Sequence, residues 1–85
     1  MKIEVFGPGC AKCVTTARNA QEAVAQLGVE AEVIKVEKID EIMKRGVMMT
    51  PAVFIDGKKC SEGKVVKSDQ IKDWIQKIRE QGEGR

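Results

Sequence analysis

Residues 2–13 read KIEVFGPGCAKC, and this stretch decides the fold. Its first five residues include β-branched and aromatic side chains typical of a strand, which the Gly-Pro-Gly triplet then ends. Two cysteines, Cys10 and Cys13, open a segment, residues 10–27, whose apolar residues recur every three or four positions. That spacing predicts an amphipathic helix, and Gly28 provides its C-terminal stop. A strand is therefore followed at once by a helix that begins with a Cys-x-x-Cys pair.

The rest of the chain alternates between the same two kinds of element. Strands are predicted at residues 31–37, 52–55 and 58–61, and helices at residues 39–45 and from Ser68 onward. The first two strands and the helix between them form a β-α-β unit, whose strands lie parallel. Asp56-Gly57 is typical of a two-residue hairpin turn, so the last two strands are expected to be antiparallel. The predicted fold is α/β in the order βαβαββα, with a four-stranded mixed sheet flanked by three helices.

Length and composition limit the possible functions. The chain has 85 residues, 42% of them hydrophobic and 33% charged, with a net charge of +2. We expect one domain over residues 1–80 and a tail, residues 81–85, that frays because it has no apolar anchor. Charges of both signs are interspersed, so neither a nucleic-acid surface nor a membrane surface is expected. No membrane span and no signal peptide are recognisable, and we therefore expect a cytoplasmic monomer.

The chain contains no histidine and three cysteines, at positions 10, 13 and 60. The lack of histidine excludes a histidine-activated nucleophile and a histidine-ligated metal. An odd number of cysteines argues against a structural disulfide framework. A zinc or iron–sulfur site would need a fourth ligand, which a carboxylate or a second copy of the chain would have to supply. We expect no metal and no other cofactor, and we expect Cys60 to be a half-buried small residue.

Cys10 and Cys13 have the spacing of a reversible disulfide. Residues three apart on a helix face the same way, with Cα atoms about 5–6 Å apart, as a disulfide requires. The positive end of the helix dipole favours a thiolate at Cys10, so Cys10 is the expected nucleophile, with a lowered pKa. Cys13 lies one turn further on the apolar stripe and suits the resolving role. Lys12 adds positive charge between them, or it is simply a solvated surface residue.

The sequence resembles the thioredoxin superfamily, and in particular its small redox-active disulfide proteins. The matching motifs are FGPGCAKC at residues 6–13, TPAVFIDGK at residues 50–58 and GKVVKSDQI at residues 63–71. The resemblance covers residues 2–79 and implies a minimal thioredoxin-like fold and a thiol–disulfide oxidoreductase. It also implies a cis peptide bond between Thr50 and Pro51, packed against the cysteine pair. The Thr50 backbone would then hydrogen-bond to an extended substrate.

The resemblance further implies partners and supporting residues. The partners would be proteins with disulfide bonds and a reductase of the thioredoxin-reductase type. Gly9 leaves Cys10 uncovered, and Ala11 and Lys12 flank the two thiols. Met49, together with Met48, either contacts a partner protein or packs over the core. Thioredoxins carry Gly-Pro where this chain has Ala-Lys, and their buried acidic residue has no clear counterpart, although Glu4 is a candidate.

A soft-metal module is the main alternative. Gly-x-Cys-x-x-Cys before a helix also resembles the copper-binding ferredoxin-like domains, and thiolates suit Cu(I). Those domains carry Met two residues before the first cysteine, where this chain has Pro8. They also end in a strand, whereas the last element predicted here is a helix. A non-catalytic interaction module on the same fold is a third possibility. The sequence favours the oxidoreductase, restored to its dithiol form by an external reductant.

Overall fold

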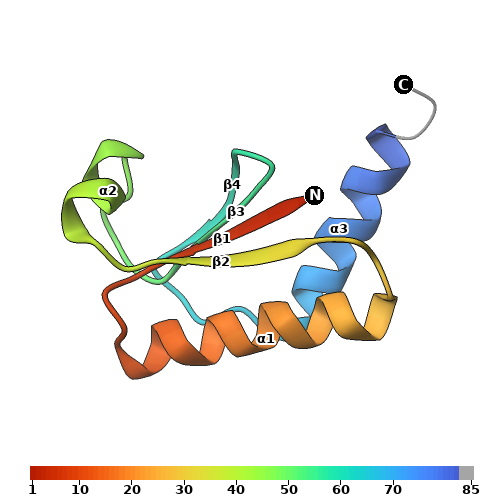
Figure 1. Ribbon diagram of the computed structural model, residues 1–85, viewed down its shortest axis with the longest axis horizontal. Coiled ribbons are helices and arrows are strands. Elements are labelled where there is room, and N and C mark those ends of the chain that lie inside the picture. Colours follow the sequence, from red (N-terminus) through yellow and green to blue (C-terminus); the bar gives the residue numbers. More distant parts are fainter. Residues whose placement is uncertain (83–85) are drawn as a thin grey trace.

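The computed structural model describes residues 1–82, which form three helices and four strands (Figure 1). In chain order these are β1 (Lys2–Phe6), α1 (Ala11–Leu27), β2 (Glu32–Val36), α2 (Ile39–Lys44), β3 (Ala52–Ile55), β4 (Lys58–Glu62) and α3 (Ser68–Gly82). The strand order is β2-β1-β3-β4, with β1 and β2 parallel and the other two pairs antiparallel. The predicted α/β fold with its mixed sheet and three helices is therefore confirmed.

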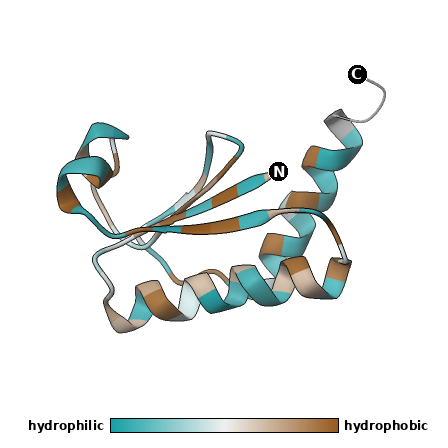
Figure 2. Ribbon diagram, in the orientation of Figure 1, coloured by the Kyte–Doolittle hydropathy of each residue, from teal (hydrophilic) through white to brown (hydrophobic). Residues whose placement is uncertain are grey.

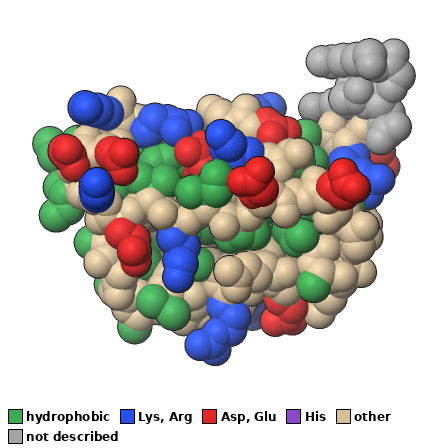
Figure 3. Space-filling view, in the orientation of Figure 1, with side chains coloured by type: hydrophobic (Ala, Val, Ile, Leu, Met, Phe, Trp, Pro, Cys, Tyr) green, Lys and Arg blue, Asp and Glu red, His purple; other side chains and the backbone are tan. Residues whose placement is uncertain are grey.

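The predicted frayed tail, residues 81–85, lies mostly outside the described part of the chain. The helix α3 continues through Gly82, and residues 83–85 are not described. Within the described residues, no helix is both long enough and apolar enough to cross a membrane. On the face drawn in Figure 3, acidic and basic side chains are interspersed, as the sequence predicts.

The two central strands, β1 and β3, are buried on both faces. Ile3 and Val5 of β1 point into a core shared with α1 and α3, whereas Phe6 points to the opposite face. On β3, Val53 and Ile55 join the first core. Successive side chains of a strand face opposite sides, so each central strand contributes to both cores. In Figure 2, hydrophobic segments are visible on β1 and β2, and hydrophobic bands recur along α1 and α3.

Small residues set the position of α1 on the sheet. Ala17, Ala20 and Ala23 are buried in the core with the β1 side chains. Because alanine projects only a methyl group, the helix backbone can lie close to the strands. The helix ends at Gly28, whose φ of 64° is left-handed and suits glycine at a C-terminal cap. This placement brings the N-terminus of α1 directly to the end of β1 (Figure 1).

The opposite face of the sheet is covered by α2 and the segment that follows it. Phe6 and Phe54 pack with ring centroids 4.8 Å apart. The Arg45 guanidinium carbon lies 5.1 Å from the Phe6 centroid and 5.0 Å from the Phe54 centroid, which is cation–π distance. Ile42 and Val47 are buried against the same rings. They anchor the chain on both sides of the turn that leads to β3.

The buried face of α3 gives the first testable prediction. Ile75 is fully buried in the α1–α3 core. Replacing it with alanine leaves a cavity and is expected to lower the free energy of unfolding by about 2–5 kcal/mol. Gln76→Ala, at an exposed neighbouring position, is the matched control and should change it by less than about 0.5 kcal/mol. Urea unfolding followed by circular dichroism measures both, and equal losses would contradict the core assignment.

Candidate functional site

Cys10 is the N-cap residue of α1, and its side chain is exposed. Its Sγ accepts a hydrogen bond from the backbone N–H of Cys13 at 3.3 Å. Hydrogen bonds from the Cys13 thiol, from the Cys13 backbone N–H and from the Lys12 backbone N–H together hold the pKa of Cys10 below its ordinary value. The two backbone donors belong to the first turn of α1, whose N–H groups have no partner within the helix. The site therefore favours a thiolate at Cys10.

Cys13 lies one turn further and is only 5% exposed. Burial raises the pKa of its thiol, and the hydrogen bond that it donates to Cys10 adds to the effect. A hydrogen bond with the Thr50 side chain lowers the pKa of Cys13, but by less than burial raises it. The two thiols thus differ in pKa because Cys10 lies exposed at the helix N-terminus and Cys13 is buried one turn further along the helix.

Three segments that are distant in sequence meet at Cys13. A Cβ added at Gly7 would lie 2.8 Å from the Cys13 Cβ, closer still to its Sγ, and 3.7 Å from the Thr50 Cβ. The Gly7 N–H donates to the Val36 carbonyl at 2.9 Å, which extends the β1–β2 pairing to this point. Position 7 therefore requires glycine, because the side chain of any larger residue would clash with Cys13.

The loop after α2 brings Thr50 and Pro51 to the cysteine pair. The Thr50–Pro51 peptide bond is cis, as the resemblance implies. Pro51 is buried, and its carbonyl accepts a hydrogen bond from the Gly63 N–H at 2.9 Å. Met48 and Met49 precede Thr50 and are 90% and 62% exposed. The Met49 side chain is thus largely exposed, although it lies beside Gly63.

The remaining predicted site residues lie around the opening to Cys10. Gly9 has a φ of 92°, a left-handed conformation that glycine adopts easily. Ala11 and Lys12, on the first turn of α1, are exposed beside Cys10. The six predicted supporting positions lie on two segments: residues 9–12, which adjoin Cys10 in the chain, and residues 49–51, of which Thr50 lies beside Cys13.

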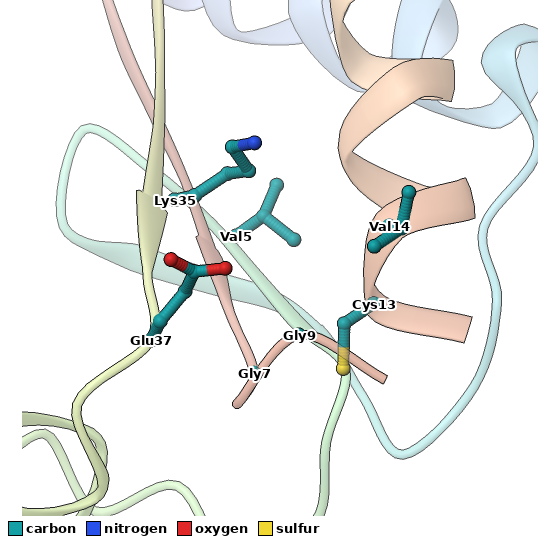
Figure 4. A pocket seen from close by; sticks show the side chains of 7 residues that line it. All are labelled: Val5, Gly7, Gly9, Cys13, Val14, Lys35 and Glu37. Atoms are coloured by element: carbon teal, nitrogen blue, oxygen red, sulfur yellow. The ribbon is translucent and has the colours of Figure 1, made fainter. Parts of the chain in front are cut away.

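A small pocket beside Cys13 contains charged residues that the sequence did not reveal. It is lined by Val5, Gly7, Gly9, Cys13, Val14, Lys35 and Glu37 (Figure 4). A Cβ added at Gly9 would lie 3.4 Å from the Glu37 Oε2. The signal that could have found Glu37 is the parallel register, in which Phe6 pairs with Val36 and places residue 37 beside the loop.

The candidate role of Glu4 near the cysteines is wrong. Glu4 forms a bidentate pair with Arg45, whose nitrogens lie 3.0 and 3.2 Å from its two oxygens. Glu4 alternates with Ile3 and Val5, which face α1, so it must point to the α2 face. Its carboxylate therefore lies across the sheet from Cys13.

Cys60 behaves as the half-buried residue that the sequence predicts. It packs on the core from β4, and its thiol donates to the Lys58 carbonyl at 3.5 Å. Burial raises the pKa of the Cys60 thiol. No group of three or more metal-binding side chains occurs within residues 1–82.

Comparison with known proteins gives consistent matches. A sequence model described as a thioredoxin domain matches residues 1–76. The thioredoxin of Methanothermobacter thermautotrophicus is 39% identical over 72 residues, which cover 85% of this chain and 94% of that protein. The thioredoxin of Methanocaldococcus jannaschii is 38% identical over 78 residues, which cover 92% of this chain and 90% of that protein.

Solved structures agree on the fold. Thioredoxin-2 of the malaria parasite, described as a component of its protein secretion machinery, superposes with a TM-score of 0.70 at 18% identity. That match covers 89% of this chain and 81% of the other. Thioredoxin 1 of Thermosipho africanus gives a TM-score of 0.65 at 22% identity, over 94% of this chain and 96% of the other. At these identities the likeness concerns the fold alone.

The difference between the thiols predicts an order of alkylation. Iodoacetamide should modify Cys10 first, with a pH midpoint below that of an ordinary thiol, because the thiolate is the reactive form. Cys13 and Cys60 should react later, since burial raises the pKa of both. Peptide mass spectrometry after timed quenching measures the order, and the urea-unfolded chain is the control. Modification of Cys13 or Cys60 ahead of Cys10 would contradict the assignment.

The close contact at Gly7 predicts a second effect. Gly7→Ala places a methyl group against Cys13 and is expected to destabilise the protein by about 1–3 kcal/mol through overpacking. Pro8→Ala, at the exposed neighbouring position, should cost less than about 1 kcal/mol. Thermal unfolding of the reduced proteins compares them. A Gly7→Ala protein as stable as the wild type would show that the contact is not tight.

Proposed function

We propose that this chain, which belongs to the thioredoxin domain family of thiol–disulfide oxidoreductases, uses Cys10 and Cys13 to reduce disulfide bonds in partner proteins. The observation that carries the proposal is the asymmetry of the pair. Cys10 is exposed with a lowered pKa, and Cys13 is buried one turn away with a raised pKa. An exposed thiolate followed by a shielded thiol is the arrangement that sequential attack requires.

The reaction consists of two exchanges. The Cys10 thiolate attacks one sulfur of the substrate disulfide, a Cys10–substrate S–S bond forms, and the other substrate sulfur leaves as a thiolate that takes a proton from water. Cys13 then gives its proton to water and attacks the Cys10 sulfur, which releases the second substrate thiolate. Two electrons have passed to the substrate, and Cys10 and Cys13 are joined as a disulfide. A reductase of the thioredoxin-reductase type returns two electrons and one proton, which restores the Cys10 thiolate and the Cys13 thiol.

Supporting residues would hold the substrate during the first exchange. The Thr50 backbone would pair with an extended segment of the partner, which adds a strand beside the site. Met49 would provide a soft apolar contact, which its exposure supports. Gly9, Ala11 and Lys12 would leave Cys10 accessible. The disulfide itself is the redox group, so the proposal includes no other cofactor, and it places the protein in the cytoplasm as a monomer.

The Cu(I) alternative is not favoured by the comparisons. Both relatives with more than a third of their residues identical are thioredoxins. The chain order βαβαββα, with α3 as the last described element, also differs from that of a domain ending in a strand. These observations support the redox role proposed for Cys10 and Cys13.

One experiment tests the proposal directly. Insulin, whose chains are joined by disulfide bonds, is reduced by the wild type with dithiothreitol as the terminal reductant. Cys10→Ser should abolish this activity, because no thiolate remains to attack. Cys13→Ser should accumulate a mixed disulfide through Cys10, visible by mass spectrometry. Cys60→Ser, the matched control, should keep the wild-type rate.

Metal content is measured on the same samples. Insulin reduction that is independent of Cys10, together with stoichiometric bound copper or zinc, would overturn the proposal and leave a metal-binding role for the pair.

A further inference from the structure

Glu62, the last residue of β4, reaches across to the loop that carries Thr50. Its Oε2 accepts hydrogen bonds from the backbone N–H of Met48 at 2.6 Å and of Met49 at 3.1 Å. Its Oε1 accepts from the Lys59 Nζ at 3.0 Å. One carboxylate therefore binds two consecutive backbone amides of the loop. The sequence alone indicates no role for Glu62.

These hydrogen bonds are charge-assisted. The Met48 N–H, the Lys59 ammonium and the Met49 N–H together lower the pKa of Glu62 to about 2, so the group is ionised at neutral pH. Hydrogen bonds to an ionised carboxylate are shorter and stronger than neutral ones. The side chain is 24% exposed, which leaves it partly shielded from competing water.

The attachment is continuous with the cysteine site. Glu62 pairs with Ala52 in the β3–β4 ladder, and the next residue, Gly63, donates its N–H to the Pro51 carbonyl at 2.9 Å. A Cβ added at Gly63 would also lie 3.1 Å from the Met49 Cβ. The end of β4 thus holds the chain immediately before and immediately after Thr50.

The effect on the loop is selective. The backbone N–H groups of Met48 and Met49 are occupied, whereas the side chains are 90% and 62% exposed, that of Met49 lying beside Gly63. An incoming strand therefore cannot use those two N–H groups as donors. Since Pro51 has no N–H and its carbonyl accepts from Gly63, the strand would pair with the Thr50 backbone while its own side chains meet the two methionines.

We propose, on the basis of the proposed function, that Glu62 is a positioning residue for protein substrates. It fixes the backbone of Met48 and Met49 so that Thr50 is presented in one register to an extended segment whose apolar side chain contacts the methionines. Glu62 takes no part in the thiol chemistry. Small disulfides, which contact only Cys10, do not need it.

The test compares two substrates. With dithiothreitol as reductant, KM and kcat are measured for insulin. For a small aromatic disulfide, bis(nitrobenzoate) disulfide, the rate constant is measured with the pre-reduced protein. Glu62→Ala should raise the KM for insulin about tenfold, because loss of positioning of this kind costs one to two orders of magnitude. Its kcat and its rate constant with the small disulfide should stay within about twofold of the wild type.

Two further variants sharpen the result. Glu62→Gln keeps a weaker, neutral acceptor and should raise the KM for insulin about threefold, and it carries the test if the alanine variant does not fold. Lys59→Ala removes the ion pair but leaves the bonds to Met48 and Met49, so it should match the wild type within about twofold.

Other outcomes overturn the inference. An unchanged KM in both Glu62 variants would show that the loop does not depend on the carboxylate. Equal losses with insulin and the small disulfide would show a general structural effect on the cysteine pair. If the wild type reduces neither substrate through Cys10, the proposed function itself fails, which the Cys10→Ser control separates from the other two results.

Discussion

The site depends on one constraint: the N-terminus of α1 must lie against the end of β1. The alanine stripe of α1 permits a close approach to the sheet, and Gly7 has no side chain to keep Cys13 away. Because the helix begins there, the backbone N–H groups of Lys12 and Cys13 in its first turn donate to the Cys10 sulfur. The burial of Cys13 follows from this placement, since a helix set further from the strands would expose both thiols. The lowered pKa of Cys10 follows from its hydrogen bonds with Cys13 and Lys12 at the start of the same helix.

The opposite face of the sheet supports the second half of the site. Val47 is buried beside Phe6 and Phe54, and Arg45 lies over both rings while pairing with Glu4. These contacts fix the beginning of the loop that leads to Thr50, and the end of β4 fixes the remainder. The loop is therefore held at its beginning and at its end, although its two methionine side chains are largely exposed.

Local patterns in the sequence predicted the elements, because apolar spacing, glycine stops and the Asp-Gly turn each act over a few residues. The cysteine pair and Thr50–Pro51 were predicted by short motifs. Glu4, a candidate for the buried acidic residue, instead pairs with Arg45, and its alternation with Ile3 and Val5 already indicates that it faces away from α1. Glu37 and Glu62 were missed for a different reason. The position of Glu37 beside the loop depends on the register of β2 against β1. The contact of Glu62 depends on how the end of β4 meets the loop before Thr50. No local sequence pattern predicts either of these long-range contacts.

The groups of the site respond to pH in separate ranges. A carboxylate with a depressed pKa contributes its stabilisation above its ordinary value and loses it as the pH falls toward the folded value, which for Glu62 is about 2. The pKa of Cys10 is lowered and that of Cys13 is raised from the ordinary value of a thiol. Glu62 is ionised at neutral pH, so the loop that presents Thr50 keeps its attachment there. Any pH dependence of disulfide exchange near neutrality then reports on the cysteine pair and not on the geometry of the surface that receives the substrate.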